Sequence, residues 1–217
     1  MEKNIFHLFG LELMEPGSFI TDMLMVVATL TFYNKLKYDK SNTWYSYFFL
    51  FMGLASFFSA FGHLLYNYTG KPLQIIGWVF SALSIYFIEM AAIKEIKTES
   101  LRKKLHFVIN LQFILFLITV LSIQHFMVVT TNTIVGLMGL VIPILSIQAF
   151  NQTSKKNVLI IVGLLLSGFP AFLYRLNFNF GGLNGKEISH LILIICFYVI
   201  FLGVNKETEK EKVITRS

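Results

Sequence analysis

Apolar residues occur in seven long blocks separated by short polar gaps. The blocks cover residues 15–34, 43–66, 73–93, 105–124, 127–150, 157–175 and 186–204. A helix needs about 20 mostly apolar residues to cross the hydrocarbon core of a bilayer. The pattern therefore predicts an all-α membrane protein, a single seven-transmembrane-helix bundle that takes up nearly the whole chain. Residues 205–217 carry a run of charges and are expected to form a solvated cytoplasmic tail.

The composition supports a membrane protein. Hydrophobic residues make up 55% of the 217 positions and charged residues only 14%, whereas soluble chains are about a quarter charged. The single cysteine, Cys196, excludes an intramolecular disulfide and a Cys-based zinc cluster. The basic residues lie in the gaps between apolar blocks, where they set membrane orientation, so no nucleic-acid partner is expected.

The distribution of positive charge predicts the orientation. Fourteen of the eighteen Lys and Arg residues lie in the tail and in the gaps after the first, third and fifth blocks. Because cytoplasmic loops are rich in Lys and Arg, the N-terminus is expected outside and the C-terminus in the cytoplasm. The abundance of Lys, Asn, Ile and Phe resembles that of low-GC bacterial genes, so a multi-pass protein of the bacterial cytoplasmic membrane is expected.

Polar side chains on three of the predicted helices should gather near the outer surface. Ionisable groups inside a bilayer are costly and usually functional, and each polar stripe should face the bundle interior. These residues are Glu15, Ser18 and Asp22 on the first helix, Ser59 and His63 on the second, and Glu187 and His190 on the seventh.

This set of side chains indicates a metal site. Imidazoles suit zinc, and a catalytic zinc ion takes three protein ligands and one water molecule. His63, His190 and a carboxylate, taken as Glu187, would complete such a set. Asp22 or Glu15 would orient a ligand or carry a proton. The alternative is that the same side chains only hold helices together through hydrogen bonds.

Other polar residues are read more simply. Glu89, near the inner end of the third block, is expected to snorkel or to pair with Lys94. Arg175 could neutralise a site carboxylate, hold an anionic headgroup or act as an interfacial anchor. Pro143 and Pro170 are predicted to kink the fifth and sixth helices, because proline removes a backbone donor and crowds the preceding turn.

Two short motifs resemble those of the CREST superfamily, which contains the alkaline ceramidases and the adiponectin/progestin receptors. They are Ser59-Ala60-Phe61-Gly62-His63 and the segment from Glu15 to Asp22. In the ceramidases a zinc ion is held by three histidines, and its bound water hydrolyses the amide of ceramide. This chain departs from that pattern twice: Lys186 stands where the family has a histidine, four residues before His190, and Gln74 stands where it has an aspartate.

The sequence leaves two functions open. One is a zinc-dependent membrane hydrolase of a lipid amide or ester, with His63, Glu187 and His190 as metal ligands and the active site near the outer face. Asp22 and Ser59 would then be catalytic, with Ser59 donating to the developing oxyanion. The other is a non-enzymatic lipid-binding or receptor-like protein that uses the same pocket. The remaining polar neighbours of the site would be Glu15, Ser18 and Gln74. The sequence does not identify the lipid or the oligomeric state.

Overall fold

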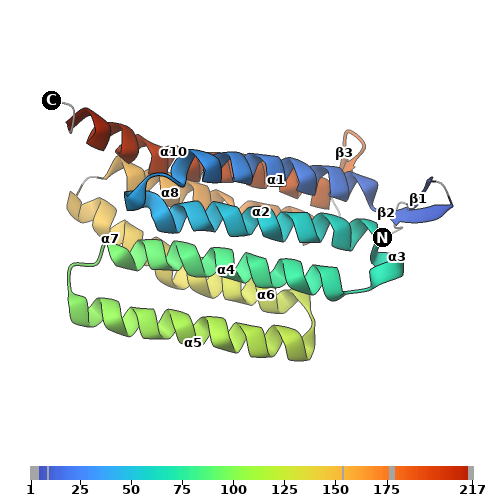
Figure 1. Ribbon diagram of the computed structural model, residues 1–217, viewed down its shortest axis with the longest axis horizontal. Coiled ribbons are helices and arrows are strands. Elements are labelled where there is room, and N and C mark those ends of the chain that lie inside the picture. The colour runs from blue at the N-terminus through green and yellow to red at the C-terminus, as the bar shows by residue number, and fades with distance from the viewer. Residues whose placement is uncertain (1–4, 9, 153, 176–178, 215–217) are drawn as a thin grey trace.

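The computed structural model describes residues 5–8, 10–152, 154–175 and 179–214. They form a bundle of helices that run along the longest axis of the molecule (Figure 1). Two short hairpins are added to the bundle: β1 (Ile5–Leu8) pairs with β2 (Leu11–Met14), and β3 (Asn179–Phe180) pairs with β4 (Leu183–Asn184). The helices are α1 (Pro16–Leu36), η1 (Lys40–Asn42), α2 (Thr43–Leu64), α3 (Tyr66–Thr69), α4 (Pro72–Lys94), α5 (Glu99–Ile123), α6 (Phe126–Ile134), η2 (Val135–Val141), α7 (Ile142–Gln152), α8 (Lys155–Leu166), α9 (Gly168–Arg175) and α10 (Gly185–Ile214).

Six helices of the described chain are long and apolar enough to cross a membrane. They cover Pro16–Leu36, Lys40–Leu64, Pro72–Lys94, Glu99–Ile123, Phe126–Phe150 and Gly185–Asn205. The prediction of a helical chain with several helices able to cross a membrane is confirmed at this level.

The remaining apolar block, residues 157–175, is not one continuous helix. It is divided into α8 and α9, which meet at Ser167 and Gly168, and neither part alone is long enough to span a bilayer. Pro170 lies in the first turn of α9, where its missing N–H costs no helical hydrogen bond. At the predicted kink near this proline the structure instead has a break between α8 and α9. The Arg175 side chain lies outside the described part of the structure.

The other predicted kink takes the form of a π-helical turn. The segment η2, Val135–Val141, is a π-helix inserted between α6 and α7, and Pro143 follows it directly. Proline cannot donate to the carbonyl four residues earlier, and a wider turn separates its ring from that carbonyl. The hydrogen bonds between residues i and i+5 in η2 thus accommodate Pro143 without ending the helix.

The core lies between α1, α2, α4, α7, α8 and α10. Its fully buried side chains include Phe48, Phe49, Ile88, Leu145 and Ile200. Between apolar helices in lipid, van der Waals packing provides the attraction, because lipid tails are as apolar as the side chains. The least buried of the six spans is α5, which lies at one edge of the bundle and faces outward along most of its length (Figure 1).

Both hairpins lie at one end of the bundle, and the C-terminus lies at the other end (Figure 1). The first hairpin is fixed to α3, since the backbone N–H of Glu12 donates to the Tyr68 hydroxyl at 2.7 Å. The Asn67 side chain also donates to the Glu12 carboxylate at 3.1 Å. The helix α10 continues to Ile214, through most of the predicted tail, and the side chains from residue 206 onward lie outside the described set.

Candidate functional site: paired histidines and carboxylates at the hairpin end

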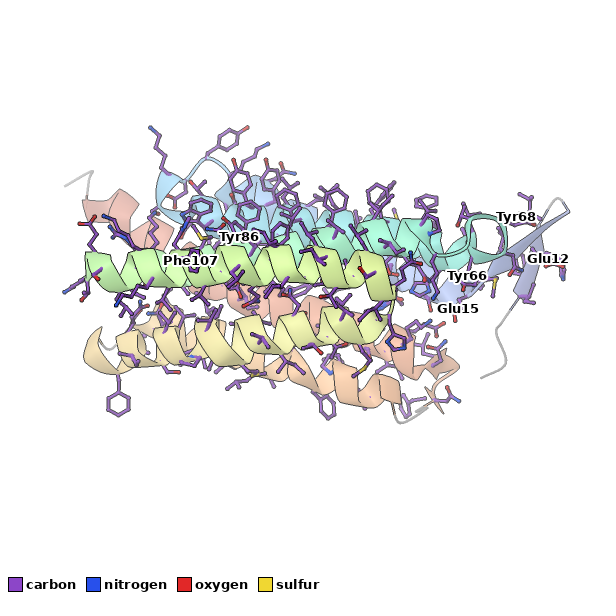
Figure 2. The ribbon with its side chains drawn as sticks, turned by 90° about the horizontal axis from the view of Figure 1, so that it is seen from below. Glu12, Glu15, Tyr66, Tyr68, Tyr86 and Phe107 are labelled. Atoms are coloured by element: carbon purple, nitrogen blue, oxygen red, sulfur yellow. The ribbon has the colours of Figure 1, made fainter. Side chains whose placement is uncertain are left out.

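Seven polar side chains from three helices meet at the hairpin end of the bundle. We call them the hairpin-end site, and they comprise Glu15, Thr21, Asp22, Ser59, His63, Lys186 and His190. They come from α1, α2 and α10, the three helices from which the sequence predicted a shared polar layer. Figure 2 shows Glu15 at this end, near Tyr66 and Tyr68 and far from Phe107.

Glu15 joins all three helices. Its Oε2 atom lies 3.0 Å from Nδ1 of His63 on α2 and 2.6 Å from Nζ of Lys186 on α10. The hydrogen bond with His63, together with the Lys186 ammonium, lowers the pKa of Glu15 from 4.5 to about 2, although partial burial opposes this shift. Glu15 is thus a carboxylate at neutral pH, and it binds one imidazole and one cation.

The backbone at Glu15 is unusual. This residue precedes α1 with φ 48° and ψ 54°, in the left-handed region. That conformation costs a non-glycine residue about 1–2 kcal/mol. Pro16 then begins the helix with a φ that is already helical. The two contacts of the Glu15 side chain explain why the chain keeps a carboxylate at this strained position.

A second histidine is held by two consecutive residues of α1. Nδ1 of His190 lies 3.0 Å from the Thr21 hydroxyl and 3.4 Å from Oδ1 of Asp22. The Thr21 hydroxyl donates to the backbone oxygens of Gly17 and Ser18, so it accepts from the imidazole. This network assigns the proton of His190 to Nδ1 and leaves Nε2 as the basic nitrogen.

The two imidazoles therefore have the same arrangement. Each presents Nδ1 to an acceptor on α1, with the carboxylate of Glu15 before His63 and that of Asp22 near His190. The Nε2 atom of each ring has no hydrogen-bond partner among the described residues. A carboxylate that fixes the tautomer and orientation of an imidazole is common in both metal sites and general-base sites.

Two buried side-chain oxygens of α1 lack a protein partner in the described structure. They are Oγ of Ser18 and Oδ2 of Asp22, on residues that are 0% and 1% exposed. Buried polar atoms are almost always hydrogen-bonded, and exceptions mark a bound water molecule or a ligand. Ser59, predicted to be catalytic, lies in the neighbourhood of the Asp22 side chain.

Glu187 has a structural role that the sequence reading did not assign. Its Oε2 accepts from the backbone N–H of Asn184 at 2.9 Å, while Oδ1 of Asn184 accepts from the backbone N–H groups of Lys186 and Glu187 at 3.0 and 3.1 Å. This reciprocal pair is a capping box at the start of α10. The other carboxylate oxygen packs over Gly17, where no side chain could fit.

The predicted three-ligand zinc set does not fit this arrangement. Within the described residues, no three His, Cys, Asp or Glu side chains are grouped so that they could hold a metal ion. His63 and His190 offer two nitrogens, but Glu187 is engaged in its helix cap and the Lys186 ammonium lies beside Glu15. A fixed cation next to the site opposes the binding of a second one.

The other predicted neighbour, Gln74, links two helices near His63. Its Nε2 atom donates to the backbone oxygen of Gly62 at 3.5 Å, and its side chain packs where a Cβ on Gly62 would lie. Lys186 and Thr21 were not predicted to be site members. Both had a signal in the sequence, because Lys186 precedes His190 by one helical turn and Thr21 follows Ser18 by three residues.

A second polar cluster lies inside the bundle, and the prediction for Glu89 was wrong. Glu89 is 2% exposed and neither snorkels nor pairs with Lys94, whose ammonium binds the backbone oxygen of Ser41. Instead, Nε2 of Gln112 on α5 donates to Oε1 of Glu89 at 2.9 Å and lies 3.2 Å from Oδ1 of Asn132 on α6.

Comparison with protein-family models identifies the family of this chain. Residues 18–209 match the model of a family of unknown function, DUF6962. The chain belongs to this family. The matched segment contains Asp22, His63 and His190 and begins just after Glu15. No curated protein and no solved structure matches the chain.

Proposed function

We propose that this DUF6962 protein crosses the membrane seven times, with the hairpin end outside, in the bacterial cytoplasmic membrane. The helices α8 and α9 together cover Lys155–Arg175, a stretch that is long enough to count as a seventh, broken span. An odd number of crossings agrees with hairpins at one end of the bundle and a C-terminus at the other (Figure 1). Fourteen of eighteen basic residues then lie on the cytoplasmic side.

We further propose that the hairpin-end site hydrolyses a lipid amide or ester near the outer face. The observation that carries this proposal is the pair of imidazoles whose Nδ1 atoms contact acceptors at the start of α1 and whose Nε2 atoms have no hydrogen-bond partner among the described residues. Both are partly exposed, with 20% and 14% of their side-chain surface accessible.

The chain's own residues can carry out each step. Nε2 of His190 takes a proton from water as the water oxygen attacks the lipid carbonyl, and Asp22 stabilises the imidazolium that forms. The Lys186 ammonium and the Ser59 hydroxyl would stabilise the negative charge on the carbonyl oxygen. The carbon–nitrogen or carbon–oxygen bond then breaks, and an imidazolium returns the proton to the leaving amine or alcohol.

The test is release of fatty acid from lipids supplied to the purified protein in nanodiscs. Long-chain N-acyl amides and glycerophospholipid esters are offered, and the acid is measured by mass spectrometry with and without a chelator. We expect turnover that the chelator does not affect and that His190→Ala lowers by about 10²- to 10⁴-fold. His7→Ala, on the exposed hairpin, is the matched control and should retain full activity.

The same samples distinguish the competing functions. About one zinc ion per chain, lost in a His63→Ala/His190→Ala double variant, would restore the three-ligand zinc hydrolase and refute the metal-free mechanism. A different result would be that the protein binds a lipid but hydrolyses none of the lipids offered, and that the double variant no longer binds it. This result would assign the site to a lipid-binding or receptor-like protein.

A further inference from the structure

A basic cavity lies near the opposite end of the bundle from the hairpin-end site. It has a volume of about 280 Å³ and opens between α4, α5 and the start of α2. Its lining residues are Trp44, Met90, Ile93, Lys94, Arg102, Lys103 and His106. Three cations and no carboxylate line the cavity, and one of the cations, Lys103, pairs at 2.7 Å with the exposed carboxylate of Glu99 outside the lining. The three cations and Glu99 together still carry a net positive charge, which favours an anionic group.

The cavity combines a charged rim with an apolar floor. Lys94, Arg102 and Lys103 are exposed, whereas Met90 and Ile93 are buried at 8% and 2% exposure. An inorganic anion would contact only the cationic side chains of the rim. A molecule that carries an anionic group next to an apolar part would contact both the cationic rim and the apolar floor.

His106 is arranged as a hydrogen-bond donor. The Tyr86 hydroxyl donates to Oδ1 of Asn110 at 3.2 Å, and Nδ2 of Asn110 lies 2.9 Å from Nδ1 of His106. Because Nδ1 accepts from the amide, the ring proton is assigned to Nε2. The imidazole thus adds an N–H donor to a cavity that already contains three cationic side chains.

An exposed apolar ridge on α5 starts at this cavity. Lys103, Phe107, Leu111 and then Ile114 and Ile118 follow one another at helical spacing, and these four apolar residues are 44–68% exposed. Figure 2 shows Phe107 on α5, near Tyr86 and far from Glu15. A headgroup at Lys103 would therefore have its acyl chains lying along α5.

We propose that this cavity binds the phosphate of an acidic phospholipid, whose acyl chains lie on the exposed ridge of α5. Clusters of Lys and Arg at the cytoplasmic surface of membrane helices attract anionic lipids. Each cation raises the affinity about five-fold. The geometry of rim, donor and ridge selects a lipid rather than a free anion. This site is independent of the hairpin-end site and of any hydrolytic activity there.

Trp44 provides a direct reporter for this lipid. The chain has only two tryptophans, and the other, Trp78, lies on α4 and packs against Phe126. In a Trp78→Phe variant in vesicles, fluorescence comes from Trp44 alone. We expect brominated phosphatidylglycerol to quench Trp44 at about ten- to thirty-fold lower mole fraction than brominated phosphatidylcholine. The Trp44→Phe variant, which reports from Trp78, should show no such preference.

Two double variants separate a built site from general surface charge. Arg102→Ala/Lys103→Ala removes two cations of the cavity, and Lys97→Ala/Lys104→Ala removes two exposed cations of the same region that do not line it. The first should abolish the preference for the acidic lipid, and the second should leave it intact. Equal loss in both variants, or equal quenching by the two lipids, would overturn the proposal. Displacement by millimolar inorganic phosphate would also overturn it, in favour of a soluble phosphate site.

Discussion

The carboxylate of Glu15 gives the sharpest test of the hairpin-end site. Replacing Glu15 with Gln keeps the size of the side chain and removes the charge that binds Lys186 and His63. The lowering of its pKa from 4.5 to about 2 corresponds to roughly 3 kcal/mol at 1.36 kcal/mol per unit. Because 22% of the side chain is exposed, solvent screening reduces this to about 2 kcal/mol.

The sign of the pH dependence follows from the direction of the shift. A carboxyl group whose pKa is lower in the folded state stabilises the fold above its unfolded pKa, about 4.5. This stabilisation is lost as the pH falls through the folded value of about 2. Glu15→Gln should therefore be less stable than the natural chain at pH 7, and the difference should narrow below pH 4.5.

Thermal unfolding of the protein in detergent measures this difference. A loss of about 2 kcal/mol lowers the melting temperature of a chain this size by about 4–8 °C. Glu99→Gln is the matched control, since Glu99 forms an exposed pair with Lys103 that contributes only a few tenths of a kcal/mol. An unchanged melting temperature at pH 7, or a loss as large at pH 2.5 as at pH 7, would refute the reasoning.

Three further predictions follow from the packing of the described residues. Gly136→Ala should cost about 2 kcal/mol in thermal unfolding, because its Cβ would overlap Oε1 of Glu89. Gly139→Ala, in the same π-helical segment and with nothing within 4 Å, should cost nothing. Glu89→Gln should keep or raise the melting temperature, since it removes a buried carboxylate that forms no ion pair among the described residues. Glu187→Gln should retain stability and activity, because Gln also completes a capping box, and a complete loss of activity would indicate a ligand role.

The sequence predicted which residues share a layer but not which side chains pair. The depth of a residue in the membrane follows from the 1.5 Å rise per residue of its helix. The sequence therefore predicts similar depths for Asp22, His63 and His190. Which side chains contact one another depends on the rotation of each helix about its axis and on the side chains of the neighbouring helix. For that reason the sequence alone predicts Glu187 as a metal ligand, although Asn184 three residues earlier carries the signal of a capping box.

Glu89 shows a second limit of reading the chain one helix at a time. Its nearness to the end of α4 suggested snorkelling, which is the usual behaviour of a charged residue there. Its burial comes from two other helices, which supply the amide groups of Gln112 and Asn132. Polar residues in the middle of two adjacent apolar blocks were visible in the sequence, but only the packing of α4 against α5 and α6 connects them.

Lys186 puts a cation at the position where a third histidine would complete a zinc site with His63 and His190. Its ammonium lies 2.6 Å from Glu15 and supplies the positive charge that holds α1, α2 and α10 together. Lys186→His would remove this cation and place an imidazole one turn before His190. We expect the variant to bind about one zinc ion per chain by elemental analysis, through three histidines. Lys186→Gln removes the charge without adding a ligand and should bind none. Equal zinc in the natural chain and in both variants would show that the ammonium does not control the metal.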